Sequence, residues 1–128
     1  MATLKVGLVS PEREVWAGEA KMVVAQTIEG QLGIMPGHAP VLGVLLDGSV
    51  VKIEPADGGE MISAMVGSGF FSIADDEVSV LAEQAVLGSE VDVSAARQDL
   101  QSAQSAAEED STAERRARAR LRAAGHEA

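Results

Sequence analysis

Two histidines are the residues of this chain best suited to proton transfer near neutral pH, and they stand far apart in the sequence. His38 lies inside the stretch GIMPGHAP, and His126 lies two residues before the last one. The chain has no cysteine and no HExxH pattern, so thiol and zincin chemistry are excluded. The stretch GQLGIMPG lacks the lysine and hydroxyl residue of a phosphate-binding loop. We therefore predict no catalytic residue, no metal site and no resident cofactor.

The stretch GIMPGHAP has two interpretations. Pro36 and Pro40 restrict the backbone around a Gly-His-Ala centre, and Gly37 permits a positive φ. One interpretation is a rigid turn between strands. The other is a stiff projection whose exposed Met35 and His38 press on a partner. The second interpretation makes this corner an interaction site, and a catalytic loop with His38 as general base is the alternative that the missing catalytic partners disfavour.

Charge is divided unevenly along the chain. Residues 1–90 hold four basic and 13 acidic residues, within a total net charge of −10. Five arginines lie close together near the other end: Arg115, Arg116, Arg118, Arg120 and Arg122. Such a basic segment can bind an acidic protein surface, an anionic ligand or its own acidic body. The net negative charge and the three aromatic residues argue against nucleic acid as a partner.

The first part of the chain has the pattern of a β domain. Alternating or β-branched apolar segments separated by glycine-rich breaks predict strands at 3–9, 21–28, 41–46, 49–54, 61–67, 69–74 and 78–83. Asp47-Gly48 predicts a hairpin between two of these strands, and residues 75–77 predict another. Short strands at this spacing indicate a sandwich or barrel. No apolar run reaches 18 residues, and the first residues lack the features of a signal peptide, so we expect a cytosolic chain.

Near residue 91 the composition changes, which predicts a β domain over 1–90 and a helical hairpin over 91–128. Asp92 is placed to cap a first helix with the apolar stripe Val93, Ala96, Leu100, Ala103 and Ala107. Residues 111–114 have the form of a capping box for a second helix with the stripe Ala113, Ala117, Leu121 and Ala124, and Gly125 is placed to end it. Because these stripes are mostly alanine, we predict a hairpin that is only weakly docked.

Four segments in order resemble the epsilon subunit of rotary (F-type) ATP synthases. Residues 29–42 (EGQLGIMPGHAPVL) carry the main motif, and residues 10–18 (SPEREVWAG) match the family's opening pattern. Residues 66–71 (VGSGFF) and 80–85 (VLAEQA) resemble two later strands of its sandwich. The resemblance covers nearly the whole chain.

The resemblance implies a flattened β-sandwich of about ten strands followed by an antiparallel two-helix domain. It implies a non-catalytic stalk subunit that binds the gamma subunit and the c-ring, without membrane insertion, at the cytoplasmic face of a bacterial cell membrane. The family's proline-bounded loop faces the c-ring, so the candidate contact residues by position are Gln31, Met35, Pro36, Gly37 and His38. The family's helical domain can move and slow ATP hydrolysis, which makes the five arginines candidates for contact with gamma and the acidic foot of the beta subunits.

ATP is a further ligand that the resemblance raises. Some members bind it with Ile/Leu-Asp-x-x-Arg-Ala at the start of the first helix. Here Asp92 matches, but Ala95 stands at the arginine position and Arg97 comes two places later, about 200° around a helix. ATP is therefore a doubtful regulatory ligand. A generic β-sandwich adaptor with a helical protein-binding tail is the alternative to the stalk subunit.

Overall fold

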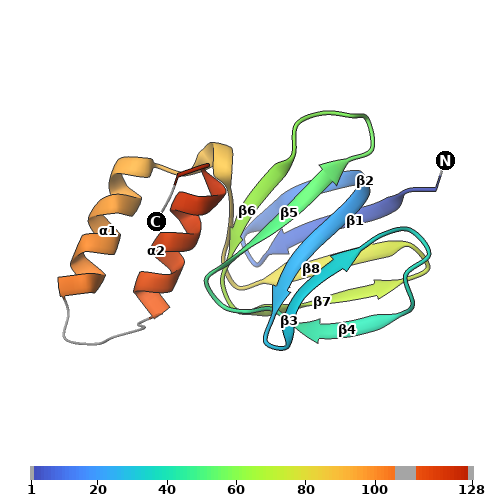
Figure 1. The fold of residues 1–128 in the computed structure, drawn as a ribbon, viewed down its shortest axis with the longest axis horizontal. Coiled ribbons are helices and arrows are strands. Elements are labelled where there is room, and N and C mark those ends of the chain that lie inside the picture. The colour runs from blue at the N-terminus through green and yellow to red at the C-terminus, as the bar shows by residue number, and fades with distance from the viewer. Residues whose placement is uncertain (1, 106–111, 127–128) are drawn as a thin grey trace.

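The computed structural model describes residues 2–105 and 112–126, which form a β-sandwich with two helices at one end (Figure 1). The strands are β1 Leu4–Ser10, β2 Arg13–Thr27, β3 Gly30–Ile34, β4 Val41–Val44, β5 Ser49–Pro55, β6 Ile62–Val66, β7 Gly69–Ala74, β8 Glu77–Ala82 and β9 Ala85–Leu87. The short 3-10 helix η1 (Gly88–Glu90) leads to α1 (Val93–Ser105) and α2 (Thr112–Ala123). The predicted β plus α fold is confirmed, with nine strands in the described residues rather than about ten.

One continuous hydrogen-bonded path joins the two layers of the sandwich. Its order is β4-β7-β8-β1-β2-β5-β6-β9, and β3 pairs with β2. The 15 residues of β2 let its first half pair with β1 and its second half pair with β3 and β5. The β1–β8 pair is parallel and the others are antiparallel. β2 is therefore the strand that carries the chain from one layer to the other.

Alternation of side chains builds the core between the layers. In β1, Leu4, Val6 and Leu8 are buried while Lys5 is exposed. The same alternation occurs in β5 and β8, where every second residue points inward. Phe71 is one of the largest fully buried side chains. The strands predicted at 3–9, 49–54 and 78–83 are therefore confirmed.

The predicted Asp47-Gly48 hairpin is wrong. A turn does form there, with Gly48 at φ +74°, but β4 pairs with β7 and β5 pairs with β2 and β6. An Asp-Gly turn reverses the chain whether or not the flanking strands pair, because pairing depends on strands that are distant in sequence. The other predicted hairpin is confirmed, since β7 pairs with β8 across Asp75 and Asp76.

The sequence also missed two strands and half of a third. β3 has two glycines among its five residues, and β9 has three residues, so neither carries a strong local signal. The first half of β2 was not predicted as a strand because it contains exposed polar residues such as Glu14 and Glu19. These segments become strands through pairing with β1, β2 and β6.

The predicted cap of the first helix and the predicted end of the second helix are confirmed. The Asp92 side chain accepts a hydrogen bond of 3.0 Å from the Ala95 N–H and caps α1. After α2, Gly125 has φ +89°, its N–H reaches the Arg122 carbonyl at 3.0 Å, and the His126 N–H reaches the Leu121 carbonyl at 2.8 Å. These two bonds form a Schellman motif. Ser111 of the predicted capping box and Ala107 of the first stripe lie outside the described residues.

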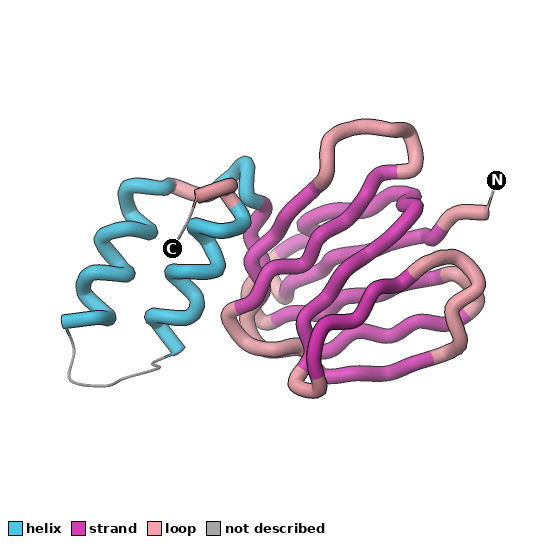
Figure 2. The backbone as a smooth tube through the Cα atoms, in the orientation of Figure 1, coloured by secondary structure: helices cyan, strands magenta, loops and turns pink. Residues whose placement is uncertain are grey.

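The second helix has two buried edges rather than one predicted stripe. Ala117 and Leu121 are buried, but Ala113 is exposed. Ala119 and Ala123 are buried against Met65 of the sheet. Because α2 packs against both α1 and the β5–β6 face of the body, it buries residues on two sides. Figure 2 shows both helices at the end of the sandwich away from the N-terminus.

Candidate functional site

The corner between β3 and β4 is a tight turn held to a second loop. Its first turn places Pro36 and Gly37 at the two central positions, with Gly37 at φ +87° and a 3.1 Å bond from the His38 N–H to the Met35 carbonyl. Proline followed by a residue of positive φ is the arrangement of a type II turn. The Gly37 N–H also donates to the Asp76 carboxylate at 2.7 Å. The corner is thereby tethered to the β7–β8 turn.

Four of the five predicted corner residues lie together, and one does not. Met35 is 59% exposed, whereas Pro36 and His38 are half-buried. His38 therefore projects less than expected, and its Nδ1 lies 2.7 Å from the Ala39 carbonyl oxygen. Gln31 lies near the other end of β3, about 13 Å from Met35 at the usual rise of a strand, and its side chain accepts a 2.9 Å hydrogen bond from Gln26.

An exposed apolar row crosses the outer face of one layer, and the sequence did not predict it. Val44 lies opposite Phe70, Phe70 lies opposite Leu81, and Leu81 lies opposite Val9. The exposed fractions of Val44, Phe70 and Leu81 are 48%, 54% and 47%. Single exposed apolar residues are common, but a continuous row over four strands marks an interaction surface. Local patterning could not find it, because the register of four strands brings the row together.

Three body glycines make room for α2. A Cβ on Gly48 would lie 2.9 Å from the Arg115 main-chain carbon, and one on Gly67 would lie 3.3 Å from Nη2 of Arg116. A Cβ on Gly88 would overlap the Ala123 carbonyl oxygen. The body is therefore shaped to receive α2 along its length, which is closer packing than the predicted weak docking implies.

The five arginines of α2 lie in different environments. Arg116 makes a two-bond ion pair with Asp47 of the β4–β5 turn, at 2.9 and 3.1 Å, and this hydrogen bonding raises the pKa of Arg116. Arg118 pairs with Glu114 at 2.9 Å, and Arg120 lies 3.6 Å from Asp99 of α1. Two members of the set remain: Arg115 is exposed and takes part in contacts of its own, and Arg122 is exposed beside the sheet.

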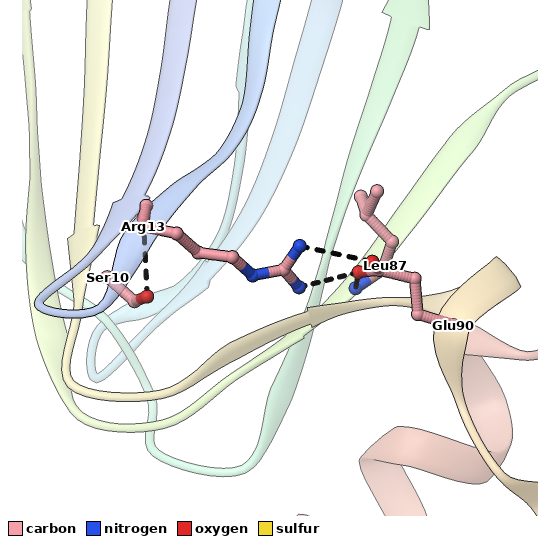
Figure 3. A network of polar contacts seen from close by, with 4 residues as sticks. All are labelled: Ser10, Arg13, Leu87 and Glu90. Atoms are coloured by element: carbon pink, nitrogen blue, oxygen red, sulfur yellow. Dashed lines mark hydrogen bonds and ion pairs between the residues drawn. The ribbon is translucent and has the colours of Figure 1, made fainter.

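A second ion pair ties the body to the segment before the helices (Figure 3). Arg13 at the start of β2 donates to both carboxylate oxygens of Glu90, at 3.1 and 2.7 Å. Glu90 also accepts a 3.3 Å bond from the Leu87 N–H. The Arg13 hydrogen bond lowers the pKa of Glu90 and raises the pKa of Arg13. The Arg13–Glu90 ion pair therefore holds the segment 87–90 to the body. Residues 91 and 92 are the only ones between this segment and the start of α1.

A cavity of about 430 Å³ lies between the body and the hairpin, at the place where the resemblance suggested ATP. Its lining includes five carboxylate residues, Glu12, Glu83, Glu90, Asp92 and Asp99, against one arginine, Arg120. Arg97 is not among the lining residues, and its guanidinium lies 3.3 Å from Nδ1 of His126. The structure therefore does not bring Asp92 and Arg97 together in one site. Such an acidic lining is unfavourable for a polyphosphate, which agrees with the prediction that ATP is a doubtful ligand.

The described residues provide neither a metal-binding cluster nor a membrane-spanning helix. There, no group of three or more His, Cys, Asp or Glu side chains is placed to hold a metal ion. In the same part of the chain, neither helix is long and apolar enough to cross a bilayer.

The family and the known proteins to which this sequence is similar all carry the name of the same ATP synthase chain. Residues 3–88 match the family described as ATP synthase, Delta/Epsilon chain, beta-sandwich domain. An ATP synthase epsilon chain of Streptomyces coelicolor is 52% identical over 123 residues, which cover 96% of each chain. The epsilon chain of Thermobifida fusca is 50% identical, with 94% of this chain and 91% of that protein covered.

Two solved structures share the fold at low sequence identity. A chain of the Euglena gracilis mitochondrial ATP synthase (OSCP/F1/c-ring) matches with a TM-score of 0.73 and 18% identity, covering 94% of this chain and 76% of that one. A chain of the Tetrahymena thermophila central stalk/c-ring structure matches with a TM-score of 0.56 and 19% identity, covering 75% and 71%. The resemblance found in the four sequence segments is confirmed: this chain belongs to the ATP synthase delta/epsilon chain family.

Proposed function

We propose that this chain is a non-catalytic rotor subunit of a proton-translocating ATP synthase, where it couples the c-ring to the gamma subunit. Its relatives at about half identity are named ATP synthase epsilon chains. Chains of the same fold come from structures titled F1/c-ring and central stalk/c-ring. The subunit would act as a peripheral component at the cytoplasmic face of the membrane, and it would contribute shape rather than chemistry.

The apolar row supports this function most directly. Val44, Phe70, Leu81 and Val9 form one stripe on a flat face whose neighbouring positions Ser72 and Ser79 are small. A subunit that transmits torque must bind its partner over a rigid surface, and a sheet face meets that need. We assign this face to the gamma subunit.

The other end of the coupling path is assigned to the corner at Met35–His38. Met35 is exposed, and the backbone beside it is fixed by the turn and by the Gly37–Asp76 bond. Because Gln31 lies at the opposite end of β3, one small polar loop of the c-ring would contact either the corner or Gln31. Single cysteines at Met35 and at Gln31, tested for crosslinking to a cysteine in a c-ring loop, distinguish the two contacts.

Regulation would follow from a choice between two sets of partners for the α2 arginines. In the docked hairpin, Arg116 is held by Asp47, and Arg118 and Arg120 are held by Glu114 and Asp99. An acidic surface of the beta subunits would compete for the same guanidinium groups. Release of α2 from the body would free Arg116 from Asp47, while Arg118 and Arg120 would exchange their partners within the hairpin for that acidic surface. Binding of the released helix there would slow ATP hydrolysis.

Binding to gamma tests the function. We expect Phe70→Asp and Leu81→Glu each to weaken binding of the purified chain to a gamma subunit by about 30-fold or more, which is the scale of a central interface residue. The measurement is calorimetric titration of the two purified proteins. Ser102→Glu, which adds a charge at an exposed position of α1, is the matched control and should bind like the unchanged chain.

The alternative adaptor function makes the opposite prediction. An adaptor for another acidic partner would show no affinity for gamma in any variant. If the unchanged chain binds gamma and Phe70→Asp binds equally well, the rotor function survives but the assignment of the apolar row is wrong.

A further inference from the structure

A groove of about 640 Å³ runs beside α2 over the outer face of β2 and β5. Its apolar lining residues are all aliphatic or thioether side chains: Met22, Val24, Leu46, Val50 and Met61. Two of them are strongly exposed for their type, Leu46 at 43% and Met61 at 50%. Since α2 covers the neighbouring part of the same face over β5 and β6, this strip is the uncovered remainder of that face.

Two cations lie on this groove within a strongly acidic protein. Lys52 comes from β5 and Arg122 comes from α2. Among the residues that the structure describes, neither is paired with a carboxylate, and no carboxylate lines the groove. The cavity on the α1 side of the hairpin is lined by five carboxylates instead. An anionic group therefore meets complementary charge here, and it would be repelled from the other cavity.

The uncharged polar side chains that line the groove already have hydrogen-bond partners within the protein. The Gln26 and Gln31 side chains bond to each other at 2.9 Å, and the Ser49 hydroxyl donates to the Leu46 carbonyl at 2.6 Å. None of the described residues lining the groove is aromatic, so a planar ring would find no stacking partner. The lining thus fits a flexible aliphatic chain that carries one anionic head.

We propose that this groove binds a fatty acid. The alkyl chain would lie along Met22, Val24 and Val50, and the carboxylate would lie between Lys52 and Arg122. A volume of 640 Å³ is within the usual range for small-molecule sites. Because Lys52 belongs to the body and Arg122 to α2, a bound carboxylate bridges the two parts and favours the docked hairpin.

Titration of the ¹⁵N-labelled full chain with dodecanoate, below its micelle concentration, tests this proposal. We expect saturable shifts of the amides of Met22, Val24, Val50 and Lys52, and slower hydrogen exchange in α2 at saturation. In the double variant Lys52→Gln/Arg122→Gln, the Kd should rise about tenfold or more, equivalent to about 1.4 kcal/mol. Lys21→Gln removes an exposed lysine of β2 that does not line the groove, so it is the matched control and should keep the original Kd.

Two probes separate the charge from the chain. Hexanoate should bind far more weakly, because its shorter chain buries less apolar surface. Dodecyltrimethylammonium, with the same chain and the opposite charge, should not shift the groove amides. The proposal is overturned by equal binding of the two dodecyl probes, by an unchanged Kd in the double variant, by shifts at Phe70 and Leu81 instead, or by loss of the folded spectrum.

Discussion

Arg13 and Glu90 illustrate what one residue pair contributes to this protein. Their side chains are half exposed, yet they join the first long strand to the segment that leads into the hairpin. Glu90 also accepts the Leu87 N–H, so its carboxylate organises the turn from β9 into η1. The pair therefore fixes the segment before the hairpin to the body as far as Glu90.

The contribution of the Arg13–Glu90 pair to the free energy of unfolding should depend on pH in the acidic range. The Arg13 hydrogen bond lowers the pKa of Glu90 in the folded chain, so its stabilisation is present above the unfolded value of about 4.3 and is lost as the pH falls through the folded pKa. We expect Glu90→Gln to be less stable than the unchanged chain between pH 6 and 8. The difference should shrink below about pH 4, as measured by urea unfolding at each pH.

A matched substitution separates this effect from a general change in charge. Glu60→Gln removes an exposed carboxylate in the β5–β6 loop and should show no such convergence. A stability difference for Glu90→Gln that stays constant down to pH 2 would mean that the ion pair contributes nothing in the folded chain.

At the scale of elements, α2 is the part whose packing decides the behaviour of the hairpin. It is the helix that contacts the sheet, while α1 packs on its other side. The contact places the small residues Ala119 and Ala123 of α2 against Met65, and Gly88 lies beneath the last turn of the helix. Close backbone approach replaces large apolar side chains, so small changes in volume have large effects.

Gly88→Ala should undock α2 while leaving the sandwich folded. The added methyl group would overlap the Ala123 carbonyl oxygen, and overpacking of this kind costs about 1–3 kcal/mol. We expect faster amide hydrogen exchange over residues 117–123, with unchanged exchange in β1 and β8. Gly7→Ala is the control, because nothing lies within 4 Å of a Cβ there. Equal protection of the α2 amides from hydrogen exchange in both variants would show that the close contact between Gly88 and Ala123 does not hold the helix.

The whole molecule combines a rigid body with an appended pair of helices, each with its own surface. The apolar row lies on one layer, the α2 seat lies on the other, and the Pro36 corner is tethered to the β7–β8 turn. These surfaces do not share residues. One body can therefore hold a partner on one face while its hairpin docks or releases on the other.

Deletion of residues 91–128 should raise ATP hydrolysis when the chain is reconstituted into an ATP synthase. The basic helix would be gone while the gamma-binding face would remain. In the full chain, inhibition should weaken as ionic strength rises, because exposed charges are screened beyond about 10 Å at 0.1 M salt. Steady-state hydrolysis rates of the two assemblies provide the measurement, and retained binding to gamma is the control. Unchanged hydrolysis after deletion would remove the inhibitory role and leave coupling intact.

Much of this architecture could be predicted from local sequence. Asp92 marks the start of α1 and Gly125 marks the end of α2, because capping depends on a few neighbouring residues. Alternating or β-branched apolar residues predicted β1, β5 and β8 as strands, because this pattern repeats over a few neighbouring residues. The corner motif could also be recognised, since two prolines and a glycine restrict the backbone wherever they occur.

Strand pairing and helix docking could not be predicted locally, because they depend on contacts between residues far apart in the sequence. Only strand pairing separates β4 from β5, makes β3 a strand and aligns Val44, Phe70 and Leu81 into one row. Only the docking of α2 shows that the helix has two buried edges and that Arg116 pairs with Asp47. Helix caps, turns and alternation of side chains depend on a few neighbouring residues, so they can be predicted from the sequence. Register and docking depend on contacts between residues far apart in the chain, so they exist only once the chain has folded.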